Sequence, residues 1–279
     1  MSNLNRDGLN FHYRDEGSGL AFFFQHGLGA DVSQPFSLFK PPAGIRLLAF
    51  DCRGHGETRP LGDPEKISID SFADDLLALL DHLEIERAIV GGISMGAALS
   101  LNFALRFPGR VLGVVLSRPA WLDSPYSGNV NVFSTMAQLI RQHGARRGEE
   151  LFQQSEAYRE TSRQSPDTAA SLLSQFTHPR AEEAVARLER IPTHTPRHTR
   201  RDWATISVPA LVMANRQDPI HPFAYGETLA RIIPGAEFRE LTPKSASVER
   251  HAADVQRHLE EFFQRRFAKQ SNGSMGQKS

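Results

Sequence analysis

Short runs of consecutive apolar residues recur along this chain, and amphipathic stretches separate them. Apolar runs rich in β-branched and aromatic residues indicate strands that are covered on both faces, as in a parallel sheet. Residues 72–83 carry Phe and Leu at helical spacing, which predicts a helix with one buried face, capped by Asp70 and Ser71. The alternation of such strands with helices of about ten to fifteen residues predicts an α/β fold with right-handed crossovers. The predicted strands are the alternating stretch 9–15 and the runs 20–24, 46–50, 88–90, 111–116, 208–214 and 236–241, and further helices are predicted over 223–232 and 248–267.

The pattern changes between residues 121 and 203, where no apolar strand runs occur and Arg, Gln, Ser and Glu dominate. We expect this segment to form a helical cap over the carboxyl edge of the sheet. Residues 1–120 and 204–267 would then form one α/β core, and the polar segment 268–279 a disordered tail. Helices within the cap are predicted over 131–143, 148–162, 167–176 and 181–190.

Charge and cysteine content exclude several classes of protein. Lys+Arg and Asp+Glu both number 32, so no excess charge indicates a nucleic-acid partner or an acidic membrane surface. The single cysteine, Cys52, excludes a disulfide framework, and we expect a buried structural thiol rather than a nucleophile. The N-terminal residues lack an apolar signal core, and no stretch reaches the ~20 apolar residues of a membrane span. We therefore expect a soluble, cytoplasmic protein.

The segment around Ser94 is the strongest candidate for chemistry. An apolar run, 88–90, leads into Gly-Ile-Ser-Met-Gly at 92–96, and small and apolar residues at helical spacing follow. Gly92 and Gly96 stand two residues on either side of Ser94, as a very tight strand-to-helix turn requires where a Cβ would collide. The turn would hold the serine in a strained conformation, with its hydroxyl exposed above the positive end of the helix. The alternative is an ordinary strand-to-helix loop.

Other candidates lie in the predicted cap. Its arginines could bind an anionic substrate, although solvated helix faces account for most of them. His194 and His198 have the spacing of metal ligands on a helix, but Pro192 and Pro196 would break that helix, so we expect no metal site. The large apolar residues of the cap could shape a pocket, although core packing is their commoner role. The arginines are Arg146, Arg147, Arg159, Arg163, Arg187 and Arg190, and the apolar residues are Trp121, Phe133, Met136 and Leu139.

Four motifs in a fixed order resemble the α/β-hydrolase fold superfamily. They are Gln-His-Gly-Leu-Gly at 25–29, Asp-Cys-Arg-Gly-His-Gly-Glu-Thr at 51–58, the serine motif at 92–96, and Asn-Arg-Gln-Asp at 215–218. The joint order is far more specific than any single motif. The chain is most similar to small, helically capped esterases, enol-lactonases and C–C hydrolases, over roughly residues 5–267. This resemblance implies a mostly parallel eight-stranded sheet, with an active site at the carboxyl ends of the strands.

The resemblance also implies roles for single residues. Ser94 would be the nucleophile that forms an acyl-enzyme. The backbone N–H groups of Leu28 and Met95 would form the oxyanion hole, where losing one donor typically costs ~3 kcal/mol of barrier. Asp218 would be the acid that orients the base, and its alternative role is to cap the turn before Pro219.

The base is a departure from the family pattern, because the loop after the last predicted strand, residues 240–249, contains no histidine. Our prediction is His221, three positions beyond Asp218, and the alternative is that His221 only lines the pocket. Lys244 could serve if burial lowered the pKa of its amine towards ~7–8. His251 fits the polar face of the final helix, where solvation is its commoner fate. We expect His26 and His55 to be structural hydrogen-bonding groups.

The sequence therefore predicts a cofactor-free serine hydrolase of a small ester, lactone or activated carbonyl compound. Because the usual histidine is missing, one alternative is a protein that binds or senses a small ligand on a hydrolase scaffold. Another is a non-hydrolytic enzyme, such as an acyltransferase or a cofactor-free enzyme that reacts with oxygen, which would use the same pocket. Dehalogenase chemistry is disfavoured, because those relatives carry a carboxylate where Ser94 stands.

Overall fold

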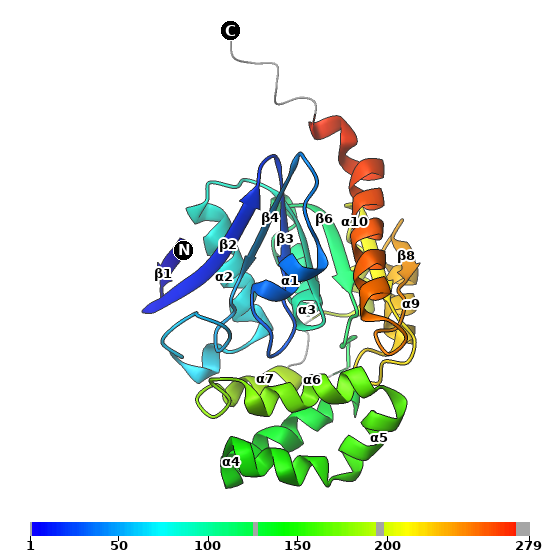
Figure 1. Cartoon of the computed structure of the whole chain (residues 1–279). Helices are drawn as coiled ribbons and strands as arrows, with labels where there is room; N and C mark the ends of the chain where they lie inside the picture. Colours follow the sequence, from blue (N-terminus) through cyan, green and yellow to red (C-terminus); the bar gives the residue numbers. More distant parts are fainter. Residues whose placement is uncertain (1, 125–127, 194–197, 272–279) are drawn as a thin grey trace.

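The computed structural model describes residues 2–124, 128–193 and 198–271, which fold around one eight-stranded sheet (Figure 1). The first two strands pair antiparallel with their neighbours, and all other neighbouring strands are parallel. The prediction of a mostly parallel α/β-hydrolase sheet is confirmed. In spatial order the strands are β1 (Ser2–Arg6), β2 (Leu9–Gly17), β4 (Ile45–Phe50), β3 (Leu20–Gln25), β5 (Ala88–Ile93), β6 (Val111–Ser117), β7 (Ala210–Ala214) and β8 (Glu237–Glu240).

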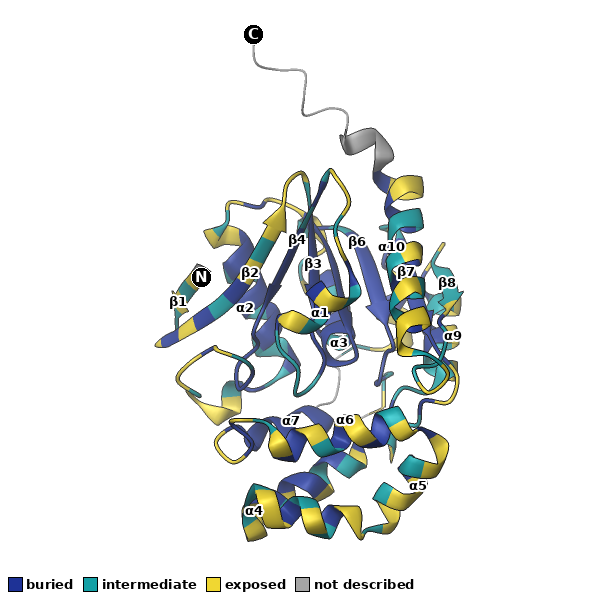
Figure 2. Ribbon diagram, viewed as in Figure 1, coloured by how far each residue is buried: buried dark blue, intermediate teal, exposed yellow. Residues whose placement is uncertain are grey.

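Helices cover both faces of the sheet, and each face has its own apolar core. Successive side chains of a strand point to opposite faces, so Phe23 joins one core while Phe22 and Phe24 join the other. The central strands are accordingly almost entirely buried, and the exposed residues lie on the outer sides of the helices, on the first two strands and in loops (Figure 2). One core includes α2 (Ile69–His82), α3 (Met95–Arg106) and α9 (Phe223–Ile232), and the other includes α1 (Ser33–Leu38) and α10 (Val248–Ser271).

The segment between β6 and β7 forms an inserted layer of helices across one end of the sheet, with α6 and α7 nearest to the strands (Figure 1). Its helix boundaries differ from the prediction in several places: α7 begins at Ala186 rather than at residue 181, and α8 was not predicted. Gly144 adopts φ 74 within one long helix and kinks it, and Ser155 caps the next helix where the sequence predicted continuous helix. The helices of this layer are α4 (Asn131–Gln153), α5 (Glu156–Gln164), α6 (Pro166–Thr177), α7 (Ala186–Thr193) and α8 (Arg200–Trp203).

Other differences lie where local sequence signals are weak. The sequence analysis missed β1, a polar strand held by backbone pairing with β2, and α1, which has only six residues. Helix α2 begins earlier than predicted, because Ser68 rather than Asp70 or Ser71 is its N-cap. Helix α10 runs to Ser271, and the rest of the predicted tail, 272–279, lies outside the described residues. No helix within the described ranges combines the length and apolar composition that a bilayer crossing needs.

Candidate active site

Ser94 occupies a strained turn between β5 and α3. Its backbone has φ 56 and ψ −109, which is unusual for a residue with a side chain, and its N–H donates to the Ser117 carbonyl at 2.9 Å. A Cβ at Gly92 would collide with the backbone of Gly96, and one at Gly96 would collide with the Gln25 carbonyl. Both glycines are therefore needed for the close approach of the helix to the strands.

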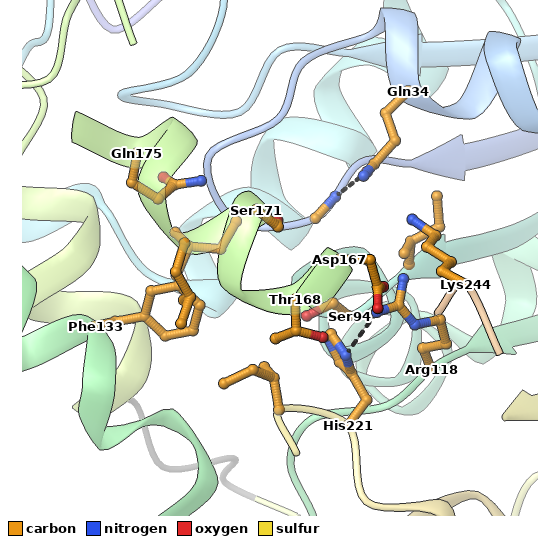
Figure 3. A pocket seen from close by; sticks show the side chains of 15 residues that line it. Gln34, Ser94, Arg118, Phe133, Asp167, Thr168, Ser171, Gln175, His221 and Lys244 are labelled. Carbon is orange, nitrogen blue, oxygen red and sulfur yellow. Dashed lines mark hydrogen bonds between the residues drawn. The ribbon is translucent and has the colours of Figure 1, made fainter. Parts of the chain in front are cut away.

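Ser94 lines a small cavity of about 100 Å³ between the sheet and the inserted helices (Figure 3). The sheet side contributes loops that follow β3, β5, β6, β7 and β8, so residues far apart in sequence meet at the carboxyl ends of these strands. Helices α4 and α6 close the other side. The cavity is lined by Gly27, Leu28, Gln34, Ile93, Ser94, Arg118, Phe133, Asp167, Thr168, Ser171, Leu172, Gln175, Ile220, His221 and Lys244.

The loop after β3 is held in place at the edge of the cavity. Leu28 lines the cavity, and the Gln34 side chain accepts a hydrogen bond from the Gly27 N–H at 2.7 Å, which fixes the loop. Gly29 has φ 76 and packs so closely against Gln175 of α6 that a Cβ would collide with it. Met95 is the first residue of α3, where an N–H has no intrahelical acceptor, but it is not among the lining residues.

The loop after β7 holds an aspartate–histidine pair. The Nδ1 atom of His221 lies 2.9 Å from each carboxylate oxygen of Asp218. Oδ1 of Asp218 also accepts hydrogen bonds from the backbone N–H groups of Ile220 and His221, so this carboxylate both shapes the turn and contacts the imidazole. His221 lines the cavity that holds Ser94, while Asp218 lies behind it with a side chain that is 2% exposed.

Arg118 is a residue of this site that the sequence analysis missed. It follows β6 with φ 50 and donates from Nε and Nη2 to Oδ2 of Asp218, at 2.9 and 2.6 Å. Its Nη2 also lies 3.1 Å from Nδ1 of His221 (Figure 3). The only signal in the sequence is an arginine directly after an apolar run, at the carboxyl edge of the sheet where the resemblance led us to expect the active site.

The charges of this triplet act on one another. Burial alone would raise the pKa of Asp218, but hydrogen bonds and electrostatic interactions with His221 and Arg118 outweigh burial and hold this pKa well below its usual range. Burial lowers the pKa of His221, and the positive charges of Arg118 and Lys244 add to that effect against the opposing charge of Asp218. His221 is therefore neutral at pH 7. We assign its proton to Nδ1, facing the Asp218 carboxylate, which leaves the lone pair on Nε2.

The sequence profile of the family described as "alpha/beta hydrolase fold" matches residues 21–246. The chain belongs to this family. It is 28% identical to 3-oxoadipate enol-lactonase 2 of Acinetobacter baylyi over 232 residues, which is 81% of each chain. The crystal structure of the enol-lactonase from Burkholderia xenovorans superposes with a TM-score of 0.71 and 26% identity, over 94% of this chain and 99% of that one. A thermophilic esterase from Thermogutta terrifontis shares the fold, with a TM-score of 0.69, 24% identity, and coverage of 91% and 94%. The protein is thus an α/β-hydrolase distantly related to enol-lactonases.

Two further candidates for the base in this α/β-hydrolase lie in different surroundings. Lys244, from the loop after β8, lines the cavity, and burial lowers the pKa of its amine to about 8. His251 is not among the lining residues. The expectation that it is solvated is wrong, because it is 1% exposed and its Nδ1 lies 2.8 Å from the Thr242 carbonyl. Burial lowers the pKa of His251 to about 4.

The remaining polar candidates are structural or lie away from the cavity. His26 accepts a hydrogen bond from the Cys52 N–H at 3.1 Å, and His55 contacts the Arg53 carbonyl at 3.0 Å. Cys52 is fully buried, and burial raises the pKa of its thiol well above the usual range. Of the cap residues considered, only Phe133 lines the cavity. Arg187 departs from the expected solvated face because it is fully buried, and His194 lies outside the described residues.

Proposed function

We propose that this α/β-hydrolase is a serine hydrolase of small esters or lactones that forms an acyl-enzyme on Ser94. The observation that supports this most strongly is that one cavity is lined both by Ser94, on its strained turn, and by His221, which is bonded to Asp218. The relatives named as enol-lactonases favour lactones and other esters over other carbonyl compounds as substrates.

The reaction would proceed in two halves. In the first, Nε2 of His221 accepts the Ser94 proton while Oγ bonds to the substrate carbonyl carbon. The N–H groups of Leu28 and Met95 would hold the negative oxygen that forms. His221 then returns its proton to the departing alkoxide, which leaves as an alcohol, or stays attached in the case of a lactone. In the second half, water gives a proton to Nε2 of His221 and bonds to the acyl carbon. The bond to Ser94 Oγ then breaks, Oγ takes the proton back from His221, and the acid is released.

Arg118 favours a second candidate function, a protein that binds a small ligand with little turnover. A hydrogen-bonded arginine neutralises much of the Asp218 charge that would otherwise stabilise the protonated His221. A weaker base would slow acylation, while the cavity and its polar lining would still hold a ligand.

The deciding experiment is reaction with a fluorophosphonate probe, with the adduct located by mass spectrometry. We expect the adduct on Ser94 and at least ~10²-fold slower labelling of His221→Gln, because the serine would lose its base. Ser174→Ala, which alters an exposed serine of α6, is the matched control and should label normally. An unlabelled Ser94, together with no turnover of an ester and lactone panel, would exclude the hydrolase and favour the binding protein.

A further inference from the structure

Two cations line the cavity beside the nucleophile. Lys244 lines it from the loop after β8 and Arg118 from the end of β6, and Figure 3 shows both side chains on the sheet side of the pocket. The two side chains differ in their hydrogen-bond and ion-pair partners. Arg118 is held by Asp218, whereas Lys244 has no hydrogen bond or ion pair within the described ranges of the chain.

An amine that is partly buried without a counter-ion is unfavourable, because it loses hydration and gains no partner. The lowered pKa of Lys244 reflects this, since burial and then the charge of Arg118 are its main causes. A structural role would normally supply a carboxylate. The position of Lys244, on the wall of the cavity that Ser94 and His221 also line, is instead typical of a group whose partner arrives with the ligand.

Arg118 can contribute to the same anion. Its Nε and Nη2 are committed to Asp218, while its Nη1 has no hydrogen bond within the described residues. The guanidinium is thereby fixed in place by Asp218 and can present its remaining N–H groups towards the cavity. A flexible ammonium and a fixed guanidinium on one wall suit a carboxylate, which accepts hydrogen bonds on both oxygens.

Asp167 is the carboxylate that could cancel this charge. It lines the cavity from the first turn of α6, and its Oδ1 accepts a hydrogen bond from Ser165 Oγ at 2.7 Å. It forms no ion pair with Lys244 or Arg118, since no nitrogen of either comes within 4.0 Å of its oxygens. The charge of Asp167 acts on Lys244 and opposes the lowering of its pKa, but the two side chains are not in contact, so Lys244 keeps its hydrogen-bond donors available for an anion in the cavity.

We propose that the substrate carries a carboxylate close to its ester or lactone group, and that Lys244, assisted by Arg118, binds this carboxylate and determines specificity. The inference rests on the proposed function and names its substrate class. Because Lys244, Arg118 and Ser94 line the same small cavity, the carboxylate and the scissile carbonyl belong to a short chain, as in monoesters of four- to five-carbon dicarboxylic acids.

The first arm of the test compares turnover of monomethyl succinate with that of its neutral counterpart, dimethyl succinate. In the unaltered protein we expect kcat/KM at least ~10-fold higher for the monoester. Lys244→Met should lower this preference by ~10-fold or more, mainly through KM, and Lys244→Arg should restore part of it. The matched control is Lys40→Met, which removes an exposed lysine that does not line the cavity. This variant should keep the preference for the monoester.

The second arm measures binding without turnover. In the Ser94→Ala protein we expect calorimetry to detect succinate but not dimethyl succinate, with binding weakened ~10-fold by Lys244→Met and also by added salt. A thermal melt of each variant checks that it is folded.

The two arms separate the possible failures. Equal or better use of dimethyl succinate, or succinate binding that ignores Lys244→Met, would overturn the carboxylate site while leaving the hydrolase intact. A loss of kcat on both esters in Lys244→Met would overturn the specificity role and identify Lys244 as the base. Succinate binding through Lys244 without turnover of either ester would keep the carboxylate site and refute the hydrolase. Neither binding nor turnover would refute both.

Discussion

The two halves of the candidate site are built in different ways. Ser94 lies within one continuous segment, where β5 turns directly into α3 and two glycines allow the close approach. The base side gathers His221, Arg118 and Lys244 from the ends of three different strands, β7, β6 and β8. The first half depends on local backbone geometry, which requires glycines at fixed positions and is therefore visible as a motif in the sequence. The second half exists only once the sheet has assembled, so a sequence motif marks Ser94 but no motif marks the residues gathered around it.

The largest effect should come from altering the local half. Gly96→Ala places a Cβ against the Gln25 carbonyl, where only backbone could move, so we expect several kcal/mol of destabilisation or no folded protein. Gly109→Ala, where a Cβ meets nothing within 4 Å, should unfold like the unaltered chain. Urea unfolding of both variants measures the difference, and equal midpoints would show that the turn tolerates a side chain.

The next effect compares the two histidines nearest to the base position. His221→Gln should lower kcat by ~10³-fold or more, because it removes the proton acceptor that Asp218 orients. His251→Gln should change kcat much less, since His251 contacts the Thr242 carbonyl rather than the cavity. Initial rates on the best substrate, with circular dichroism as a check on folding, give the comparison. A larger loss of kcat in His251→Gln than in His221→Gln would identify His251 of α10 as the base.

His251 should instead influence stability with pH. Its pKa is about 4 in the folded protein, against 6.5 for an ordinary histidine, so the unfolded chain binds the proton more readily. The free energy of unfolding should therefore reach its highest value above pH 6.5 and decrease as the pH drops towards 4. Protonation of His251 accounts for up to about 3 kcal/mol of this decrease. Denaturation at several pH values should show a shallower slope for His251→Gln. An unchanged slope would mean that other buried histidines dominate.

The smallest predicted effect concerns Arg118 as a group that positions and tunes the base. Its charge is one cause of the lowered pKa of His221, so Arg118→Gln should raise that pKa. Because activity requires neutral His221, the acid limb of the kcat/KM profile should move to higher pH. The control is Arg110→Gln, which alters an arginine that is paired with Asp81 at the opposite end of β6 from Arg118. Its pH profile should not move. A displacement to lower pH would show that Arg118 does not act through charge.

The sequence alone determined the alternation of strands and helices, the inserted helical segment and the turn that carries Ser94. These features follow from side-chain periodicity and from glycines that a close backbone approach requires, and both are local properties. Local signals were weakest for β1, a polar strand that forms by pairing with β2.

Only the tertiary structure decided what surrounds Ser94. It bonded Arg118 to Asp218, 100 residues away, and buried His251 against the loop that precedes α10. It also placed Lys244 on the cavity wall with no hydrogen bond or ion pair to any residue that the structure describes. The burial of these side chains, and the charged groups that lie near them, depend on where the ends of several strands meet in space. No periodicity along the chain encodes that meeting, which is why the base could be proposed from sequence but not distinguished from its neighbours.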